Sequence, residues 1–290
     1  MKILVLGSNG QLGRCLADQL LSTHHVMVFA TRADLDITDF AVTKDNITQI
    51  KPDLIINASA YTAVDKAEDE RELAYLINQH ALANIAETCA QLNCGLIHVS
   101  TDYVFDGTAT EPYIETDSTN PQGVYGDSKL RGEEAIQASG CEYLIIRTAW
   151  VFSEYGSNFL KTMLRLGTGH DEIGVVGDQI GCPTYAQDIA GCILRLTEYF
   201  REVGFESGIF HYCGDEPCSW FQFAEAIFAS AAECGLVTSA SIKRITTVEY
   251  PTLAPRPAYS VMGCHELYHK FQIPPSDWRG AISKVLNTMQ

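Results

Sequence analysis

The chain alternates short segments that are almost wholly apolar with longer segments whose apolar residues recur at helical spacing. Five apolar segments are candidate strands, and they span residues 2–7, 25–30, 53–59, 95–101 and 143–149. Strands that are apolar along their whole length must be covered on both faces, so the alternation predicts an α/β fold with a doubly wound parallel sheet. In such a sheet ligands bind where the strands end, so we expect the chemistry in the loops that follow these strands.

The first candidate strand runs directly into three glycines, Gly7, Gly10 and Gly13, and then into a helical pattern. Glycines at this point let the backbone turn tightly and approach a pyrophosphate at the helix N-terminus, although an ordinary βα turn would also use them. The strand before and the helix after favour a Rossmann-type dinucleotide-binding domain over residues 1–150. After residue 150 the pattern loosens, which predicts a smaller C-terminal α/β lobe over 151–290 that binds substrate, with some segments returning to the first domain.

Composition narrows the possible partners. The chain has 290 residues and a net charge of −16, which disfavours nucleic acid and anionic membrane surfaces. No apolar run approaches the roughly 18 residues of a membrane span, and no signal-peptide pattern precedes the first strand, so we expect a cytoplasmic protein. The ten cysteines form no C-x-x-C pair, and no metal-site spacing of His, Cys and carboxylates occurs, so no metal is expected.

Two short motifs suggest acid catalysis. Tyr125 and Lys129 stand four apart at the start of a helical stretch and therefore share one face, where a lysine charge is expected to lower the pKa of the phenol. An ordinary helix in which the tyrosine packs and the lysine is solvated would show the same spacing. Upstream, Ser100 and Thr101 end a strand, which places hydroxyls where a nicotinamide would lie and where they could bond a substrate carbonyl oxygen.

The glycine spacing, Thr101, Tyr125 and Lys129 come in an order that resembles the extended branch of the short-chain dehydrogenase/reductase superfamily. Further segments, among them "VDKAE" (64–68), "STDYVFDG" (100–107) and "RTAWVF" (147–152), resemble the dTDP-4-dehydrorhamnose reductases over about residues 1 to 280. The resemblance implies NADPH-dependent reduction of dTDP-4-dehydro-β-L-rhamnose to dTDP-β-L-rhamnose, the last step in making that sugar donor.

Carried onto this sequence, the resemblance implies roles for individual residues. Thr101 and Asp102 would contact substrate, Tyr125 would donate the proton, and Lys129 would also hold the nicotinamide ribose. Trp150 would lie beside the sugar, although a tryptophan at a domain junction is more often part of a core. The remaining cofactor contacts would come from Gly10, Gln11, Leu12, Asp36, Ile37, Ala58, Ser59 and Ala60. Asp36 could instead cap a helix.

Three further observations concern cofactor preference, phosphate binding and oligomeric state. The second strand ends in Thr31 and Arg32 without an acidic tip, which favours NADPH, with NADH possible. Arg256 is a candidate phosphate ligand in an acidic protein, and equally a solvated loop residue. Some family members carry an acidic residue early in the first helix for a magnesium-linked dimer, but this chain has Gly13-Arg14-Cys15 there, which argues against metal-dependent dimerisation. The expected state is a monomer or a homodimer.

Two other functions share these motifs. A sugar-nucleotide dehydratase or epimerase would use the same cofactor loop and Tyr-Lys pair, but similar dehydratases carry a further acid directly after Thr-Asp, where this chain has Tyr103. A regulatory subunit similar to that of methionine adenosyltransferase would keep the fold and bind NADP without turnover. The presence of Thr101, Tyr125 and Lys129 argues against that reading.

Overall fold

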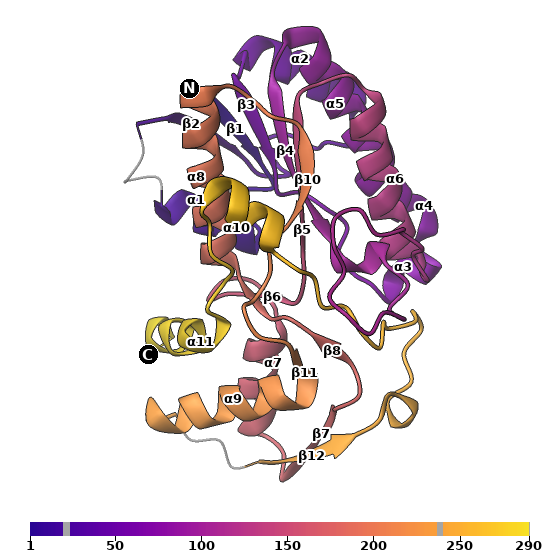
Figure 1. Cartoon of the computed structure of the whole chain (residues 1–290), viewed down its shortest axis with the longest axis vertical. Helices are drawn as coiled ribbons and strands as arrows, with labels where there is room; N and C mark the ends of the chain where they lie inside the picture. Colours follow the sequence, from indigo (N-terminus) through magenta and orange to yellow (C-terminus); the bar gives the residue numbers. More distant parts are fainter. Residues whose placement is uncertain (20–23, 237–239, 290) are drawn as a thin grey trace.

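The computed structural model describes residues 1–19, 24–236 and 240–289. Its centre is a parallel sheet in the order β10-β5-β4-β3-β1-β2 (Figure 1). The strands are β1 (Lys2–Leu6), β2 (Val26–Ala30), β3 (Leu54–Asn57), β4 (Gly95–Thr101), β5 (Tyr143–Thr148) and β10 (Gly208–His211). The predicted parallel sheet is therefore confirmed, and the strand order reverses beside β1, where ligand sites of such sheets form.

Helices cover both faces of the sheet. One face packs on α1 (Gln11–Asp18), α8 (Ala186–Val203) and α10 (His265–Phe271), and its core includes Ile3, Val5 and Ile193. The other face packs on α2 (Phe40–Ile50), α5 (Ala81–Leu92) and α6 (Val124–Ala138). Successive side chains of each strand point to opposite faces, so covering both faces requires the continuous apolar strands seen in the sequence.

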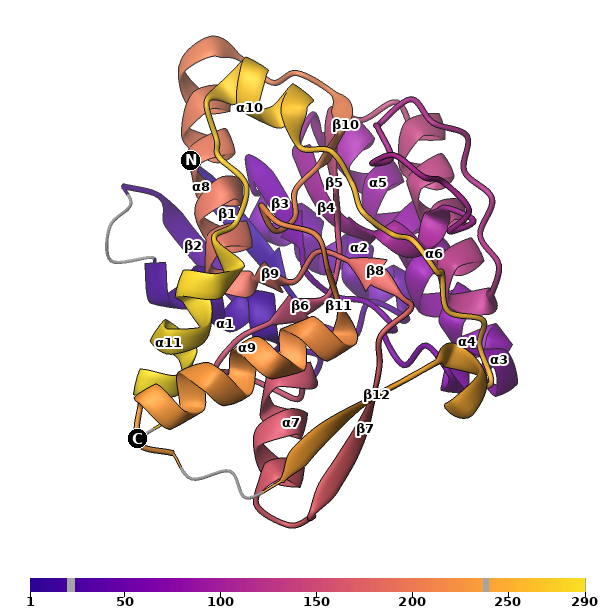
Figure 2. The same ribbon diagram turned by 60° about the horizontal axis from the view of Figure 1, so that its bottom comes forward.

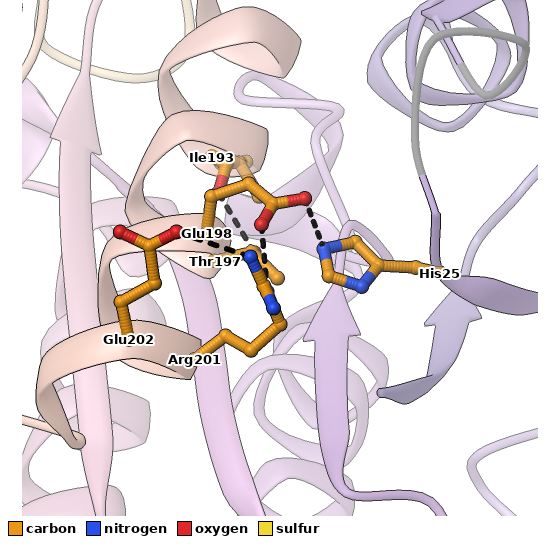
Figure 3. A network of polar contacts seen from close by, with 6 residues as sticks. All are labelled: His25, Ile193, Thr197, Glu198, Arg201 and Glu202. Atoms are coloured by element: carbon orange, nitrogen blue, oxygen red, sulfur yellow. Dashed lines mark hydrogen bonds and ion pairs between the residues drawn. The ribbon is translucent and has the colours of Figure 1, made fainter.

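Helix α8 lies late in the sequence but belongs to the sheet layer. His25, just before β2, approaches Glu198 of α8 with its Nε2 atom 3.0 Å from the carboxylate, and Arg201 donates to the same carboxylate at 2.8 Å (Figure 3). Within the helix, the Thr197 hydroxyl donates to the Ile193 carbonyl at 2.8 Å. The late helix is thus tied to the start of the second strand.

A second core lies beyond the ends of the strands (Figure 2). The elements around this core are β6 (Val151–Phe152), α7 (Phe159–Gly167), β7 (Glu172–Val176), β9 (Thr184–Tyr185), β11 (Cys218–Ser219), α9 (Trp220–Glu233), β12 (Ser241–Ile245) and α11 (Trp278–Thr288). The short elements β8 (Ile180–Gly181) and η4 (Thr247–Glu249) lie outside it. Phe152, Phe223 and Trp278 are buried at its centre. Through the described ranges, no helix is both long and apolar enough to cross a membrane.

The helical stretch between β3 and β4 is interrupted. After α3 (Lys66–Asp69) come α4 (Arg71–Tyr75), one π-helical turn η2 (Leu76–His80) and then α5. The π turn presents the Asn78 carbonyl to α6, where a Cβ at Gly132 would lie 2.1 Å from that oxygen. A π turn shifts the direction of backbone carbonyls, so this irregularity serves the close packing of η2 on α6.

Candidate active site

The turn after β1 forms one wall of a cavity at the sheet edge. Gly7 has a φ of +76°, and a Cβ there would lie 2.7 Å from the Ser59 backbone nitrogen, so a side chain would meet both strain and backbone. Gly10 is the N-cap of α1 and brings no side-chain oxygen to the first-turn amides. Uncapped amides at a helix start favour an anion. The turn therefore fits the pyrophosphate of a dinucleotide.

We call the adjoining cavity the cofactor-side cavity. It has a volume of about 290 Å³. Among the residues expected to bind the cofactor, its lining includes Gly7, Gly10, Arg32, Asp36, Ile37, Ala58, Ser59 and Ala60. The sequence analysis missed four other lining residues, Asn9, Leu35, Thr38 and Ile77. The loops after β1, β2 and β3 thus meet as predicted, because the carboxyl ends of parallel strands share one edge.

The other expected cofactor residues near this loop make different contacts. Leu12 packs into the sheet core, and Gly13 lies against the Gly7 carbonyl. The Gln11 side chain accepts hydrogen bonds from the Ser153 hydroxyl at 2.8 Å and from the Asn158 amide at 2.9 Å. Gln11 therefore joins α1 to the segment before α7.

The tip of β2 carries paired charges. The Arg32 guanidinium lies 3.2 Å from Asp36, and the arginine side chain is 73% exposed. Thr31 donates from its hydroxyl and its amide to Asp34. Asp36 accepts hydrogen bonds from Thr38, which together with Arg32 hold the pKa of its carboxyl below the usual value. Asp39 caps α2, so Asp36 is free of the capping role.

Helix α6 is fixed so that Tyr125 meets the end of β4. Glu68 accepts from the Val124 amide at 2.8 Å and so caps the helix start. A Cβ at Gly126 would lie 2.2 Å from the Tyr103 carbonyl oxygen, so the glycine lets α6 approach η3 (Asp102–Val104). The contact from Glu68 gives the "VDKAE" segment a positioning role that the sequence alone did not show.

Thr101, Asp102 and Tyr125 form one hydrogen-bonded group. The Thr101 hydroxyl donates to Asp102 Oδ1 at 3.0 Å and is hydrogen-bonded to the Tyr125 hydroxyl. Burial raises the pKa of Asp102 to about 6, against hydrogen bonds from Ser260 and Thr101 that lower it. Burial also raises the pKa of Tyr125 to about 12, so its phenol holds its proton at neutral pH. The group can therefore donate a proton to an oxygen placed beside it.

Lys129 lies one turn along α6, buried as its place on the same face requires. Its Nζ lies 2.7 Å from the Val99 carbonyl oxygen and 2.9 Å from His98 Nε2. The expectation that its charge lowers the pKa of Tyr125 is wrong in this structure. Burial is the largest influence on the phenol and moves its pKa upward, and burial likewise lowers the pKa of Lys129 to about 8.

A larger cavity of about 520 Å³, here called the outer cavity, lies between η3 and the second core. Its lining includes Arg256, as the sequence suggested, together with Asp65, Tyr103, Phe159, Gln179, Trp220, Tyr250 and Thr252, which it did not. Arg256 donates to Asp65 at 2.7 Å, while its buried Nη1 has no hydrogen-bond partner in the described part of the chain. A buried guanidinium nitrogen with spare donors fits an anionic group.

Trp150 does not line the outer cavity itself but packs against Trp220, which does. Its ring stacks on that of Trp220 with centroids 3.5 Å apart, and its φ is +46°. A bulky residue in this backbone region is strained, and such strain concentrates at binding sites. Through residues 1–19, 24–236 and 240–289 no group of three His, Cys, Asp or Glu side chains could hold a metal ion.

The sheet order, the glycine turn and the Thr-Tyr-Lys group define an extended short-chain dehydrogenase/reductase. A family model described as "RmlD substrate binding domain" matches residues 1–290. The chain is 44% identical to the dTDP-4-dehydrorhamnose reductase of Aggregatibacter actinomycetemcomitans, over 98% of both chains. A crystal structure of a dTDP-4-dehydrorhamnose reductase from Clostridium acetobutylicum superposes with a TM-score of 0.93 at 38% identity, covering 100% of each chain. The chain therefore belongs to the dTDP-4-dehydrorhamnose reductase family.

A further solved relative bears on the cofactor. The dTDP-4-dehydrorhamnose reductase of Bacillus anthracis, determined in complex with NADP, superposes with a TM-score of 0.90 at 35% identity and 99% coverage of each chain. Solved UDP-glucose 4-epimerases share the architecture at 16 to 18% identity, which speaks for a common fold alone.

Proposed function

We propose that this chain is an NADPH-dependent dTDP-4-dehydrorhamnose reductase that reduces the 4-keto group of dTDP-4-dehydro-β-L-rhamnose. The proposal depends on Thr101, Tyr125 and Lys129, which come together at the end of β4. There the protonated Tyr125 phenol lies between the glycine turn that fits a dinucleotide and the outer cavity, which contains the unpaired guanidinium nitrogen of Arg256. When bound, NADPH supplies the hydride for the ketone carbon.

The chain's own residues would act as follows. Gly7, the loop after β3 and the uncapped start of α1 bind the dinucleotide. Tyr125 donates its proton to the carbonyl oxygen as negative charge develops there, while the Thr101 hydroxyl orients the phenol. Trp220, which lines the outer cavity and is supported by the stacked ring of Trp150, offers an aromatic surface for the sugar nucleotide.

Charge recognition is divided between two arginines. Arg256 would bind the diphosphate of the substrate through the guanidinium nitrogen that Asp65 does not occupy. Arg32, at the rim of the cofactor-side cavity, would accommodate the 2′-phosphate of NADPH. We place the reaction in the cytoplasm, with the protein a monomer or a homodimer.

The test is turnover with defined nucleotide-linked 4-keto sugars. The proposal predicts NADPH oxidation only in the presence of such a sugar, and an NMR spectrum of the product with the C4 configuration of dTDP-β-L-rhamnose. Purified protein that retains NAD⁺ and leaves free NADPH unused would indicate a dehydratase or an epimerase. Binding of a partner enzyme without any turnover would indicate a regulatory subunit.

A further inference from the structure

One polar side chain of the outer cavity has no role in the reduction described above. Gln179 lies in the turn between β7 and β8 and lines the outer cavity, although it is only 7% exposed. Its side-chain nitrogen Nε2 donates to the Thr247 hydroxyl at 3.0 Å. In the described part of the chain its oxygen Oε1 has no hydrogen-bond partner, and unlike Arg147 Nη1 this atom is not sealed from solvent. The oxygen therefore opens into the outer cavity.

The direction of the hydrogen bond at Gln179 is set by Asp178, the residue before it. The Thr247 hydroxyl donates to Asp178 Oδ1 at 2.7 Å, and the Thr247 amide donates to the same oxygen at 2.9 Å. Burial opposes ionisation of Asp178, but these hydrogen bonds outweigh it and lower the pKa of the carboxyl, so at neutral pH the group can only accept. The single hydroxyl proton of Thr247 is thus committed to Asp178.

The consequence falls on the Gln179 amide. A hydroxyl whose proton is already donated can only accept, so Thr247 requires the NH₂ end of the amide. A flipped amide would set two oxygens against each other with no proton between them. The Gln179 side chain must therefore turn its oxygen away from Thr247 and present it to the outer cavity.

An oxygen acceptor in this position selects for a particular chemistry. The diphosphate of a sugar nucleotide offers only acceptors, so Gln179 Oε1 would repel it, and Arg256 already supplies donors for it. The sugar and the nucleoside, in contrast, carry N–H and O–H groups. Trp220 and Tyr250 line the same cavity, and their rings exclude water that would compete for such a donor.

We propose that Gln179 is a specificity residue that accepts a hydrogen bond from an N–H or O–H group of the sugar nucleotide, with its amide held in place by Thr247 and Asp178. The inference rests on the proposed function, because the donor belongs to the substrate named there. That substrate carries three kinds of donor, namely thymine N3–H, the deoxyribose hydroxyl and the hydroxyls of the hexose. An analogue that lacks the donor leaves the Gln179 oxygen without a partner, which is how a hydrogen-bonding site rejects it.

The first test is calorimetric titration of dTDP-β-L-rhamnose into wild-type protein and Gln179→Met, which keeps the length of the side chain but removes its oxygen. We expect the dissociation constant of dTDP-β-L-rhamnose to rise about tenfold and that of NADPH to stay within twofold. Gln49→Met, at an exposed position on α2, is the matched control and should change neither constant. Unchanged binding of the sugar nucleotide in Gln179→Met, or an equal loss of NADPH affinity, would overturn the proposal.

Two further probes, dTDP and N3-methyl-dTDP, identify the donor. If the donor is thymine N3–H, dTDP loses the same factor in Gln179→Met, whereas N3-methyl-dTDP binds both proteins alike. If it is the deoxyribose hydroxyl, both probes lose that factor. A loss confined to dTDP-β-L-rhamnose assigns a hexose hydroxyl. Wild-type protein that binds none of the dTDP probes would refute the proposed function, whereas binding that Gln179→Met leaves unchanged would refute this proposal alone.

The second test concerns the orientation of the amide, and Thr247 supplies its variants. Thr247→Val removes the hydroxyl and frees the amide to rotate, so binding of dTDP-β-L-rhamnose should weaken severalfold, whereas Thr247→Ser keeps the hydroxyl and should bind like the wild type. Added to Gln179→Met, Thr247→Val should cause no further loss, because both act through one oxygen. Thr48→Val, which removes an exposed threonine hydroxyl on α2, is the matched control. Additive losses would show that Thr247 does not act through Gln179.

The orientation can also be measured without any ligand. In ¹⁵N-labelled protein the side-chain NH₂ signals of Gln179 are assigned by their loss in Gln179→Met. We expect the proton donated to Thr247 to lie downfield, and to move upfield in Thr247→Val but not in Thr247→Ser. Signals that are the same in all three proteins would show that Thr247 does not hold the amide, and would overturn the proposal.

Discussion

The cofactor-side cavity and the outer cavity are built by different means. The first is lined largely by backbone and small side chains from loops that follow β1, β2 and β3, in the order of the chain. The second is lined by aromatic and charged side chains drawn from positions as far apart as Asp65 and Arg256. A parallel sheet brings strand ends to one edge whatever the side chains are, whereas the outer cavity exists only where particular side chains pack.

This difference predicts which changes each cavity tolerates. Backbone approach governs the cofactor-side cavity, so its glycines are critical and its exposed side chains tune affinity. Side-chain contacts govern the outer cavity, so single truncations there should affect substrate and spare the cofactor. Tyr125 lies between the two, hydrogen-bonded to Thr101 at the end of β4 and packed on Tyr103 of the outer cavity.

The largest effect is expected at Tyr125, which lies between the two cavities. Its loss should impair catalysis itself, and not the binding that either cavity provides. Tyr125→Phe removes the phenolic proton and should lower kcat by roughly 10² to 10⁴, the usual contribution of one general acid. The dissociation constant for NADPH should change little. Stopped-flow hydride transfer and a cofactor titration measure the two quantities separately.

The matched control for this variant is Tyr103→Phe, since Tyr103 lies edge to face with Tyr125 at a centroid distance of 5.5 Å. Its loss of a hydroxyl should cost far less in kcat. A larger loss of kcat in Tyr103→Phe than in Tyr125→Phe would indicate that the proton donor is Tyr103, in the outer cavity.

The next largest effect is expected in the outer cavity. Arg256→Ala should raise the KM for the sugar nucleotide about 10- to 100-fold, or about 1.4 to 2.7 kcal/mol, because a charge-assisted contact to the diphosphate is lost. NADPH affinity should stay within twofold. Arg279→Ala, which removes an exposed arginine paired with Glu216, should leave both constants unchanged. An equal loss of NADPH and substrate affinity would show that the two cavities are not separate in function.

A smaller effect is expected at the rim of the cofactor-side cavity. Arg32→Asp should raise the KM for NADPH about tenfold, or about 1.4 kcal/mol, and leave the KM for NADH nearly unchanged, because only NADPH carries the 2′-phosphate. The control is Arg131→Asp on the outer surface of α6, which makes the same change in net charge. Steady-state kinetics with both cofactors measure the ratio, and equal effects on the two would refute the role of Arg32.

The sequence was sufficient for regions governed by repeating patterns. The five predicted strands formed within a few residues of their expected bounds, and Tyr125 and Lys129 both point from the first turns of α6. The strand β10 was missed, because its four residues stand alone after a long helix and carry no periodic signal. The π turn in η2 was missed because its cause, the approach of α6 at Gly132, is a tertiary contact.

The outer cavity could not be derived in the same way. Asp65 pairs with Arg256 across 191 positions, and Trp220 stacks on Trp150, so each contact depends on the assembled fold. Arg256 was a candidate only because it is a basic residue in a net-acidic chain whose expected substrate carries a pyrophosphate. The influence on Tyr125 was also misjudged, because spacing along a helix shows that Lys129 is near but does not show that His98 and Val99 engage its amine.

The last prediction concerns stability in place of catalysis or binding, and it takes one carboxylate from each region. Asp102, at the junction, has its pKa raised by burial to about 6, whereas Asp34, at the tip of β2, has its pKa lowered by hydrogen bonds from Thr31. Between about pH 4 and 6 the folded protein holds a proton on Asp102 that the unfolded chain has released, so stability falls as the pH rises through this window. The maximum cost is about 3 kcal/mol, from a shift of about two units.

Asp102→Asn removes this titration while keeping an acceptor for Thr101, so the Tm of the variant minus that of the wild type should increase by a few degrees from pH 4 to pH 7. Asp34→Asn should show the opposite sign. Its carboxylate contributes stability above its unfolded pKa that is lost as the pH falls, so the variant should lose Tm relative to the wild type as the pH rises from 3 to 5. Thermal melts across pH 3 to 8 measure both differences. Two differences of the same sign would mean that burial does not raise the pKa of Asp102 while hydrogen bonds lower that of Asp34.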